Sequence, residues 1–521
     1  MVTRIVAQQV AREATRKVVD SVVPVARRAG KTARVVRNNA SLAAGGMLGL
    51  AGERMTKVDT AWLRMDSPSN LMMIMGVWTL KPGIKYQDLC RRVQERLLEY
   101  DRFRQRVRED AAGATWVEDA GFDIERHVVR EKLPRRPRGE EQAALQQRVG
   151  ELAMQPLDRE HPLWQVHLVE NYQGGSALIV RIHHCIADGI ALISVTMSLV
   201  DGGAPPPERK RRQARAGAED WIADTLIKPF TDMTVRALGA AGEGAVRSLG
   251  LLRDPQKGLA GSLDLAKLAY QVLTDAAALA LMPDDSKTRL KGKPGREKRV
   301  AWCEPIPLEE VKAVGKALNC SINDVLLSCV AGSIGEYLKS LGDDVAGQEI
   351  RAMIPVNLRP PLEQAHKLGN RFGLVPLVLP IGLDNPVERV YEVRRRMGAL
   401  KGSTQPLLAF GLLAVAGLLI KPAQEAMLSL FGKKTTAVMT NVPGPREKLK
   451  FLGSTLEQSM FWVPQSGDIG LGVSILSYGG GVQFGVITDS TLCPDPQKII
   501  DEFEPEIAKL SLVTLMLPWG E

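Results

Sequence analysis

The chain has 521 residues, which is too many for one ordinary hydrophobic core, so the length predicts two large domains. Its composition, 45% hydrophobic and 24% charged residues, is that of a globular protein. The net charge of +9 is unevenly spread, because the first 50 residues hold nine Lys or Arg against two Asp or Glu. Such a basic segment favours contact with nucleic acid, an anionic membrane or a phosphorylated substrate, or is simply a solvated tail.

The remaining bulk properties exclude several protein classes. The six cysteines contain no Cys-x-x-Cys pair and no zinc-type cluster, which indicates reduced thiols in the cytoplasm. No continuous apolar region follows the basic N-terminus, so we expect no secretory signal. The longest apolar run, residues 406–420, is shorter than the ~20 residues that a spanning helix needs. Any membrane contact is therefore expected to be peripheral.

In chain order, residues 1–50 are expected to be an appendage. Apolar residues recur at helical spacing between Ile5 and Val22, with basic residues among them. This pattern is typical of an interfacial amphipathic helix, and equally of a helix packed on the body of the protein.

A mixed α/β pattern begins near Met55. We predict strands at residues 71–80, 122–128 and 176–182, and helices at residues 86–100 and 190–200. The proline-rich, basic segment 204–217 predicts an exposed linker, and residues 218–282 predict long helices rich in Ala and Leu.

The second half repeats the mixed pattern after another basic, Gly- and Pro-broken segment at residues 283–299. Ser321, followed three residues later by Asp324, predicts the N-cap of a helix over residues 322–338. Further predicted elements are strands at 350–356 and 372–379, a hairpin from 473–476 and 482–487, and a closing helix over 499–510.

The candidate catalytic residues lie in the loop after the strand predicted at residues 176–182. It holds the adjacent residues His183 and His184, with Asp188 and Gly189 shortly after them. Neighbouring side chains on an extended segment point to opposite sides, so one imidazole can face substrate while the other packs inward. A neutral imidazole with a pKa near ~6.5 accepts a hydroxyl proton at neutral pH. Asp188 then either orients an imidazole or anchors the loop through a basic partner. The alternative is a purely structural histidine pair beside a helix-capping Asp.

The sequence lacks the motifs of several other catalytic classes. The sequence has no Gly-x-Ser-x-Gly nucleophile elbow and no Gly-x-Gly-x-x-Gly loop. Gly30-Lys31-Thr32 has Val25 where a phosphate loop needs its first glycine. Adjacent histidines rarely share one metal ion, and no Glu or Cys cluster accompanies them. A single-step transfer without metal is therefore the simpler hypothesis.

Several segments together resemble one family, the bacterial wax ester synthase/diacylglycerol acyltransferases. The loop matches the histidine signature of acyltransferases that use CoA or carrier-protein thioesters. The segments that resemble the narrower family are, in order, Val58-Asp59-Thr60-Ala61-Trp62-Leu63, Pro162-Leu163-Trp164, Asn323-Asp324, Pro355-Val356-Asn357-Leu358-Arg359 with Gly369-Asn370, and Asn441-Val442-Pro443-Gly444-Pro445.

The resemblance implies an α/β fold of two chloramphenicol-acetyltransferase-like domains joined by a helical crossover, with the active-site tunnel between them. The expected organisation is a basic extension (1–50), an N-terminal acyltransferase domain (51–203), a linker and helical crossover (204–300) and a C-terminal acyltransferase-like domain (301–521). It also implies that His184 is the general base. Asn323 is expected either to donate to the oxyanion or to cap its helix, while the Pro162 and Asn441 segments shape the pocket wall and a nearby loop.

The expected reaction joins long-chain acyl-CoA, as cosubstrate, to a fatty alcohol or diacylglycerol, giving wax esters or triacylglycerol without a further cofactor. The alternatives are a carrier-protein-dependent condensation or ester-forming domain, and a non-catalytic lipid-binding protein. The expected location is cytoplasmic, peripherally on the inner membrane face or on lipid inclusions, with no nucleic-acid partner. The residues that bind CoA are unknown: the basic segments 209–215 and 287–299 meet its phosphates or are solvated linkers.

Overall fold

The computed structural model describes residues 52–110, 113–134, 137, 139–206, 282–358, 368–400, 424 and 432–516. The chain divides into two compact units, and the fold and site below belong to the unit formed by Glu53–Arg209, Asp284–Phe410 and Ala416–Glu521. The helix expected within residues 1–50, the helices expected at 218–282 and the apolar run at 406–420 lie outside the described residues.

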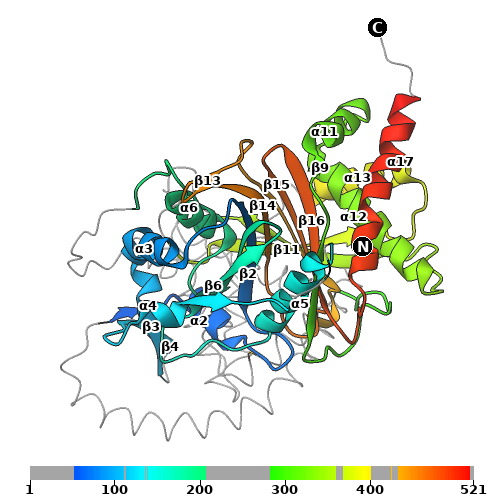
Figure 1. Ribbon diagram of the computed structural model, residues 1–521. Helices are drawn as coiled ribbons and strands as arrows, with labels where there is room; N and C mark the ends of the chain where they lie inside the picture. The colour runs from blue at the N-terminus through cyan, green and yellow to red at the C-terminus, as the bar shows by residue number, and fades with distance from the viewer. Residues whose placement is uncertain are drawn as a thin grey trace, which may run out of the picture. The chain divides into compact units, whose positions relative to one another are not determined.

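The first sheet combines strands from both halves of the chain (Figure 1). Its order is β13 (Lys450–Phe451), β14 (Ser454–Trp462), β2 (Met73–Lys81), β7 (Gly175–His183), β6 (Trp164–Tyr172) and β5 (Val128–Glu131). All neighbours are antiparallel except β5 and β6. Because β14 pairs directly with β2, the C-terminal half of the chain extends the sheet that carries the histidine loop.

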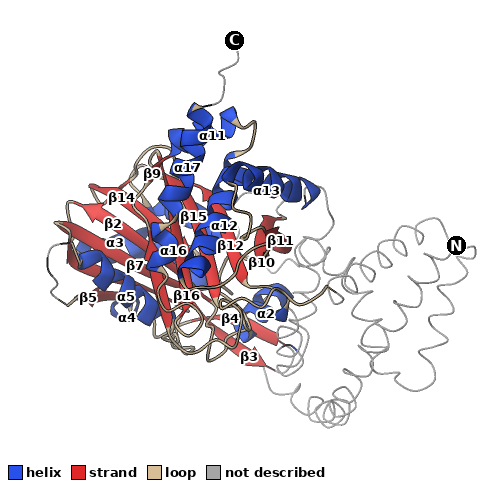
Figure 2. Cartoon of the chain, turned by 90° about the vertical axis from the view of Figure 1, so that its right-hand side faces the viewer, coloured by secondary structure: helices blue, strands red, loops and turns tan. Residues whose placement is uncertain are grey.

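The second sheet is built entirely from the C-terminal half. Its order is β11 (Phe372–Leu379), β10 (Ile350–Asn357), β12 (Ala437–Pro443), β15 (Leu471–Tyr478), β16 (Gly481–Asp489) and β8 (Lys298–Trp302), with β9 (Ile306–Pro307) also paired to β16. Helices gather beside it (Figure 2): α11 (Leu308–Ala317), α12 (Ile322–Ser340), α13 (Pro386–Leu400), α16 (Gln497–Asp501) and α17 (Phe503–Leu515). Their apolar side chains and those of the strands form one continuous core.

The remaining elements come from the N-terminal half of the chain. A small third sheet has the order β1 (Glu53–Arg54), β4 (Gly113–Glu118) and β3 (Gln105–Asp110). The helices are α2 (Lys57–Arg64), α3 (Tyr86–Arg96), α4 (Ile124–His127), α5 (Glu141–Ala153) and α6 (Gly189–Leu199), and two 3₁₀ turns follow α3 at Leu97–Glu99 and Asp101–Phe103. Buried side chains of α5 join those of β2, β7 and β8 in a second core.

Predicted elements with strong local signals are confirmed. The strand predicted at 372–379 is β11, and the Gly479-Gly480-Gly481 turn joins β15 to β16 as an antiparallel hairpin. Ser321 and Asp324 form the expected capping box of α12, since each side chain accepts from the other residue's backbone N–H.

Two predicted elements are wrong. Residues 122–128 are not a strand: Asp123 accepts from Glu125 N at 3.0 Å and starts the short helix α4, and β5 begins only at Val128. The closing helix is two helices, α16 and α17, which are separated at Glu502.

One further expectation concerned membrane spans. Within the described part of the chain, no single helix is long and apolar enough to cross a bilayer. The pair α11 and α12, bent by 102°, meets the criterion together by length and composition. Most side chains of α12 are buried in the core of the second sheet.

Candidate active site

The end of β7 places both candidate histidines. His183 is the last residue of the strand and pairs with Met73 of β2. The backbone N–H of His184 donates to Met72 O at 2.7 Å, so the chain stays tied to β2 for one residue more. Both side chains are buried, with 3% and 4% of their surface exposed. The loop that follows turns into α6, which begins immediately after Asp188.

His183 is held at both ring nitrogens. Its Nε2 lies 3.2 Å from Asp66 Oδ1, and the backbone N–H of Cys185 points at its Nδ1 at 3.2 Å. Burial opposes the charged ring, whereas Cys185 and the hydrogen bond to Asp66 raise the pKa of His183 above its usual value. The N–H that Cys185 directs at Nδ1 requires an unprotonated Nδ1, so these contacts are those of a neutral ring protonated on Nε2. In either protonation state Nε2 carries the proton that Asp66 accepts. His183 is therefore an anchored ring rather than an available base.

His184 has a different environment. Its ring stacks on Trp62 of α2, with centroids 4.3 Å apart and planes 12° apart, and Phe372 approaches within 5.6 Å. Burial, reinforced by the neighbouring His183, lowers the pKa of His184 to about 4, although its own carbonyl, Asp188 and Asn370 act in the opposite direction. The ring is therefore neutral at pH 7, which is the form that a general base requires.

Asp188 anchors the loop. Its Oδ1 accepts from Ala191 N at 3.0 Å, which makes it the N-cap of α6. Its Oδ2 accepts from Arg371 N at 2.9 Å, and its own backbone N–H donates to Gly369 O at 3.3 Å. Of the roles left open by the sequence, these contacts show the helix cap, and the second carboxylate oxygen also ties the loop to the backbone of Arg371.

A polar frame from three other segments surrounds the loop. Asp59 of α2 is fully buried, and its Oδ1 accepts from both Asn370 N (3.2 Å) and Asn370 Nδ2 (2.8 Å). Its Oδ2 lies 3.2 Å from the Arg102 guanidinium, which also donates to Ile186 O at 2.8 Å. None of these three residues was predicted from the sequence as a site residue, although Asp59 and Asn370 belong to segments that carry the family resemblance.

Asn323 lies at the start of α12, as predicted, but it is not the helix cap. Ser321 caps that helix, while the exposed Asn323 accepts at Oδ1 from Asn441 Nδ2 at 2.8 Å. The Asn323 segment and the Asn441 segment, 118 residues apart, are thereby brought together. No hydrogen bond or ring contact between described residues joins Asn323 to His184.

Trp164 packs in the core of the first half. It is fully buried, donates from Nε1 to Phe103 O at 2.8 Å, and stacks on His127 with ring centroids 4.5 Å apart. Its backbone lies in β6, next to β7. Trp164 of the Pro162 segment therefore supports the strand that carries the histidines from the neighbouring strand of the same sheet.

Three of the seven cations of residues 287–299 are engaged within the protein. Arg289 pairs with Asp343 at 2.7 Å, and Lys291 donates to the carbonyls of Gly432 and Thr435. Lys298 is buried, donates to Asn70 Oδ1 at 2.7 Å, and has its pKa lowered to about 8 by burial. These three side chains are therefore poorly suited to meet CoA phosphates.

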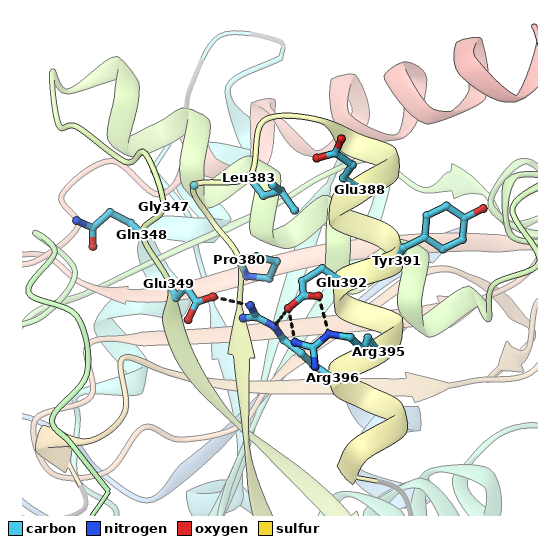
Figure 3. Close-up of a pocket in the computed structure, with 11 residues that line it drawn as sticks. Gly347, Gln348, Glu349, Pro380, Leu383, Glu388, Tyr391, Glu392, Arg395 and Arg396 are labelled. Carbon is cyan, nitrogen blue, oxygen red and sulfur yellow. Dashed lines mark hydrogen bonds and ion pairs between the residues drawn. The ribbon is translucent and has the colours of Figure 1, made fainter.

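A surface cavity of about 660 Å³ lies elsewhere, between α13 and the adjoining ends of β10 and β11 (Figure 3). Its arginines are already paired: Arg395 contacts Glu392 at 2.6 Å, and Arg396 contacts Glu349 at 2.5 Å. None of the predicted site residues lines it. In the part of the chain that the structure describes, no three His, Cys, Asp or Glu side chains gather as a metal site would require.

Comparison with solved structures defines the fold. A wax ester synthase/diacylglycerol acyltransferase from Marinobacter aquaeolei superposes with a TM-score of 0.61 at 20% identity, over 89% of this chain and 99% of that one. The first condensation domain of the CDA synthetase gives 0.53 at 15% identity, over 89% and 96%. The fold is therefore that of two condensation-like, chloramphenicol-acetyltransferase-like α/β domains, as predicted.

Family models and relatives then give the family. The wax ester synthase/diacylglycerol acyltransferase catalytic domain matches residues 55–326, and the WS/DGAT C-terminal domain matches residues 368–511. Two proteins of Mycobacterium tuberculosis named as diacylglycerol O-acyltransferases are 27% identical over 478 residues (88% of this chain, 96% of the relative) and 30% identical over 400 residues (76% and 83%). The chain belongs to the wax ester synthase/diacylglycerol acyltransferase family and is an O-acyltransferase.

Proposed function

We propose that this O-acyltransferase moves a long-chain acyl group from acyl-CoA to the hydroxyl of a fatty alcohol or diacylglycerol, with His184 as the general base. The observation that carries the proposal is the enclosed, neutral imidazole of His184, fixed against Trp62 at the end of β7. An imidazole in this form accepts a hydroxyl proton without first losing one of its own.

The chemistry balances in one transfer. His184 takes the hydroxyl proton as the alcohol oxygen attacks the thioester carbonyl carbon, and a C–O bond forms. The C–S bond then breaks, and the departing CoA sulfur receives the proton from the imidazolium. Negative charge collects on the carbonyl oxygen in between and needs a hydrogen-bond donor. We assign that role to Asn323, whose Oδ1 is already used by Asn441, which leaves its N–H₂ group to donate.

The test is the reaction itself, with a matched control. Purified enzyme receives palmitoyl-CoA with hexadecanol or with a diacylglycerol, and thiol release and ester formation are measured together. His184→Ala should lower turnover by ~10²–10⁴-fold, the usual scale for losing a positioned base. His127→Ala is the control, because His127 is also a buried imidazole stacked on a tryptophan, yet it lies outside the loop.

The outcomes separate the alternatives. A well-folded His184→Ala enzyme with near-normal turnover would rule out the base. Ester formed only from a carrier-bound acyl group would favour a carrier-dependent enzyme, and lipid binding without turnover would favour a non-catalytic protein.

We also propose that the enzyme works at the cytoplasmic face of the membrane or on lipid inclusions, because its acceptors are nearly insoluble in water. The basic residues 1–50 support this, since each Lys or Arg near an anionic leaflet contributes ~1 kcal/mol that salt weakens. The full chain and a chain that begins at Met55 are floated with anionic liposomes at low and high salt. Equal, salt-independent flotation of both would remove any role for the N-terminal charges.

A further inference from the structure

Two buried polar atoms beside the histidine loop lack a hydrogen-bond partner among the described residues: Nδ1 of His184 and Oδ1 of Asn370. Each belongs to a side chain with 4% of its surface exposed. Buried polar atoms are nearly always paired, so an unpaired donor site and an unpaired acceptor in the same place call for an explanation. Asn370 is close enough to the ring to favour its charged form, although no bond of ordinary geometry yet joins the two.

The amide of Asn370 is fixed in orientation. Its Nδ2 donates to Asp59 Oδ1 and to His184 O, both at 2.8 Å. Both partners are acceptors, so the nitrogen must lie on that side and the carbonyl oxygen on the other. The His184 carbonyl is the other acceptor near the ring, and it receives one of these hydrogen bonds. Oδ1 of Asn370 is the buried acceptor that still lacks a donor among the described residues.

The backbone around Asn370 is held as firmly as its side-chain amide. Gly369 has φ +136°, a conformation that glycine tolerates, and a side chain there would approach Arg102 and Asp59. Asp188 holds the residues on both sides, through Gly369 O and Arg371 N. Three consecutive residues are thus tied to the loop and α2.

We propose that Asn370 is a positioning residue for His184, in that its Oδ1 accepts the Nδ1 proton and so keeps Nε2 unprotonated for the substrate hydroxyl. The inference rests on the proposed role of His184 as base. A neutral imidazole carries one proton, and only the tautomer with that proton on the enclosed Nδ1 leaves Nε2 able to accept. A rotation of the ring or of the amide when substrate binds would complete the bond, since catalytic hydrogen bonds are often long in the free enzyme.

The test compares Asn370→Ala with Asn70→Ala in the full chain. Asn70 is the matched control: it is equally buried, donates to Gly467 O at 2.7 Å and likewise links the two halves, but it lies outside the histidine loop. Asn370→Ala should lower kcat by about 10²-fold, the scale for a misplaced catalytic group, with the KM for palmitoyl-CoA changed less than about 2-fold. Asn70→Ala should lower the melting temperature while kcat stays within about 2-fold.

A double variant tests whether Asn370 acts through His184. In a His184→Ala background, Asn370→Ala should cause no further loss of turnover, because residues that act as one unit are non-additive. An equal fold-loss in both backgrounds would overturn the inference, as would a kcat for Asn370→Ala equal to that of Asn70→Ala. Near-normal turnover in His184→Ala alone would instead defeat the proposed function.

A spectroscopic measurement covers the case in which Asn370→Ala fails to fold. Intact enzyme with ¹⁵N-labelled histidine is observed by NMR, and the spectrum of His184→Ala identifies the missing resonances. The expected result is a proton on Nδ1 and none on Nε2 of His184 at neutral pH. A proton on Nε2 would overturn the inference without any change at Asn370.

Discussion

The environment of His184 predicts an unusual pH dependence. Burial lowers the pKa of this imidazole from 6.5 to about 4. At pH 5.5 an ordinary imidazole with a pKa near 6.5 is only about 9% neutral, whereas one with a pKa of about 4 is about 97% neutral. Lowering the pH from 7.5 to 5.5 should therefore leave kcat/KM nearly unchanged, where an exposed histidine base would lose about nine-tenths of it.

The assay is the initial rate of thiol release at limiting palmitoyl-CoA between pH 5 and 8. Stability needs a separate control, because the unfolded chain protonates His184 near pH 6.5 and the folded chain only near pH 4, so stability falls as the pH falls through this interval. Enzyme held at pH 5.5 and returned to pH 7.5 must recover its full rate. A reversible acid limb with its midpoint near pH 6.5 would refute the reasoning.

Three further predictions concern single residues. Asp188→Ala removes the cap of α6, worth ~1 kcal/mol, and the tie to Arg371 N, so melting temperature and turnover should fall together; an unchanged melting temperature would contradict this. Asn323→Ala should lower kcat ~10²–10³-fold, whereas Ser321→Ala, which removes the actual helix cap, should affect mainly stability; a normal rate for Asn323→Ala would exclude the oxyanion role. Trp62→Ala should cost ~3–5 kcal/mol in the free energy of unfolding, measured by denaturant titration, and should also lower turnover because it frees the His184 ring; full activity would show that stacking does not position the base.

The sequence predicted those parts of the fold that depend on nearby residues. The end of β7, the start of α6 at Asp188 and the capping box of Ser321 are decided by hydrophobic alternation or by side-chain oxygens within three residues. The histidine loop could be located for the same reason, because a buried strand that ends in a polar turn is visible in the sequence itself.

Contacts between distant segments could not be predicted in this way. The pairing of β14 with β2 aligns Trp462 with Met75, and no local periodicity specifies which strand becomes the neighbour of which. The bond between Asp59 and Asn370 joins residues that are 311 positions apart. Asn370 was visible only as part of a segment resembling the family, because an isolated asparagine carries no signal of its partner.

These long-range contacts bring two of the family segments, those of Asp59 and Asn370, to the histidine loop. Asp59 holds Asn370, Asn370 holds the carbonyl of His184, and Arg371 N donates to Asp188, so the loop is fixed by α2 on one side and by residues 369–371 on the other. The match to the C-terminal family domain begins at residue 368, immediately before residues 369–371, which hold the loop. The C-terminal family domain therefore contributes directly to the position of His184, which lies in the N-terminal half. A separated N-terminal half would keep both histidines but would lose the residues that hold their loop in place.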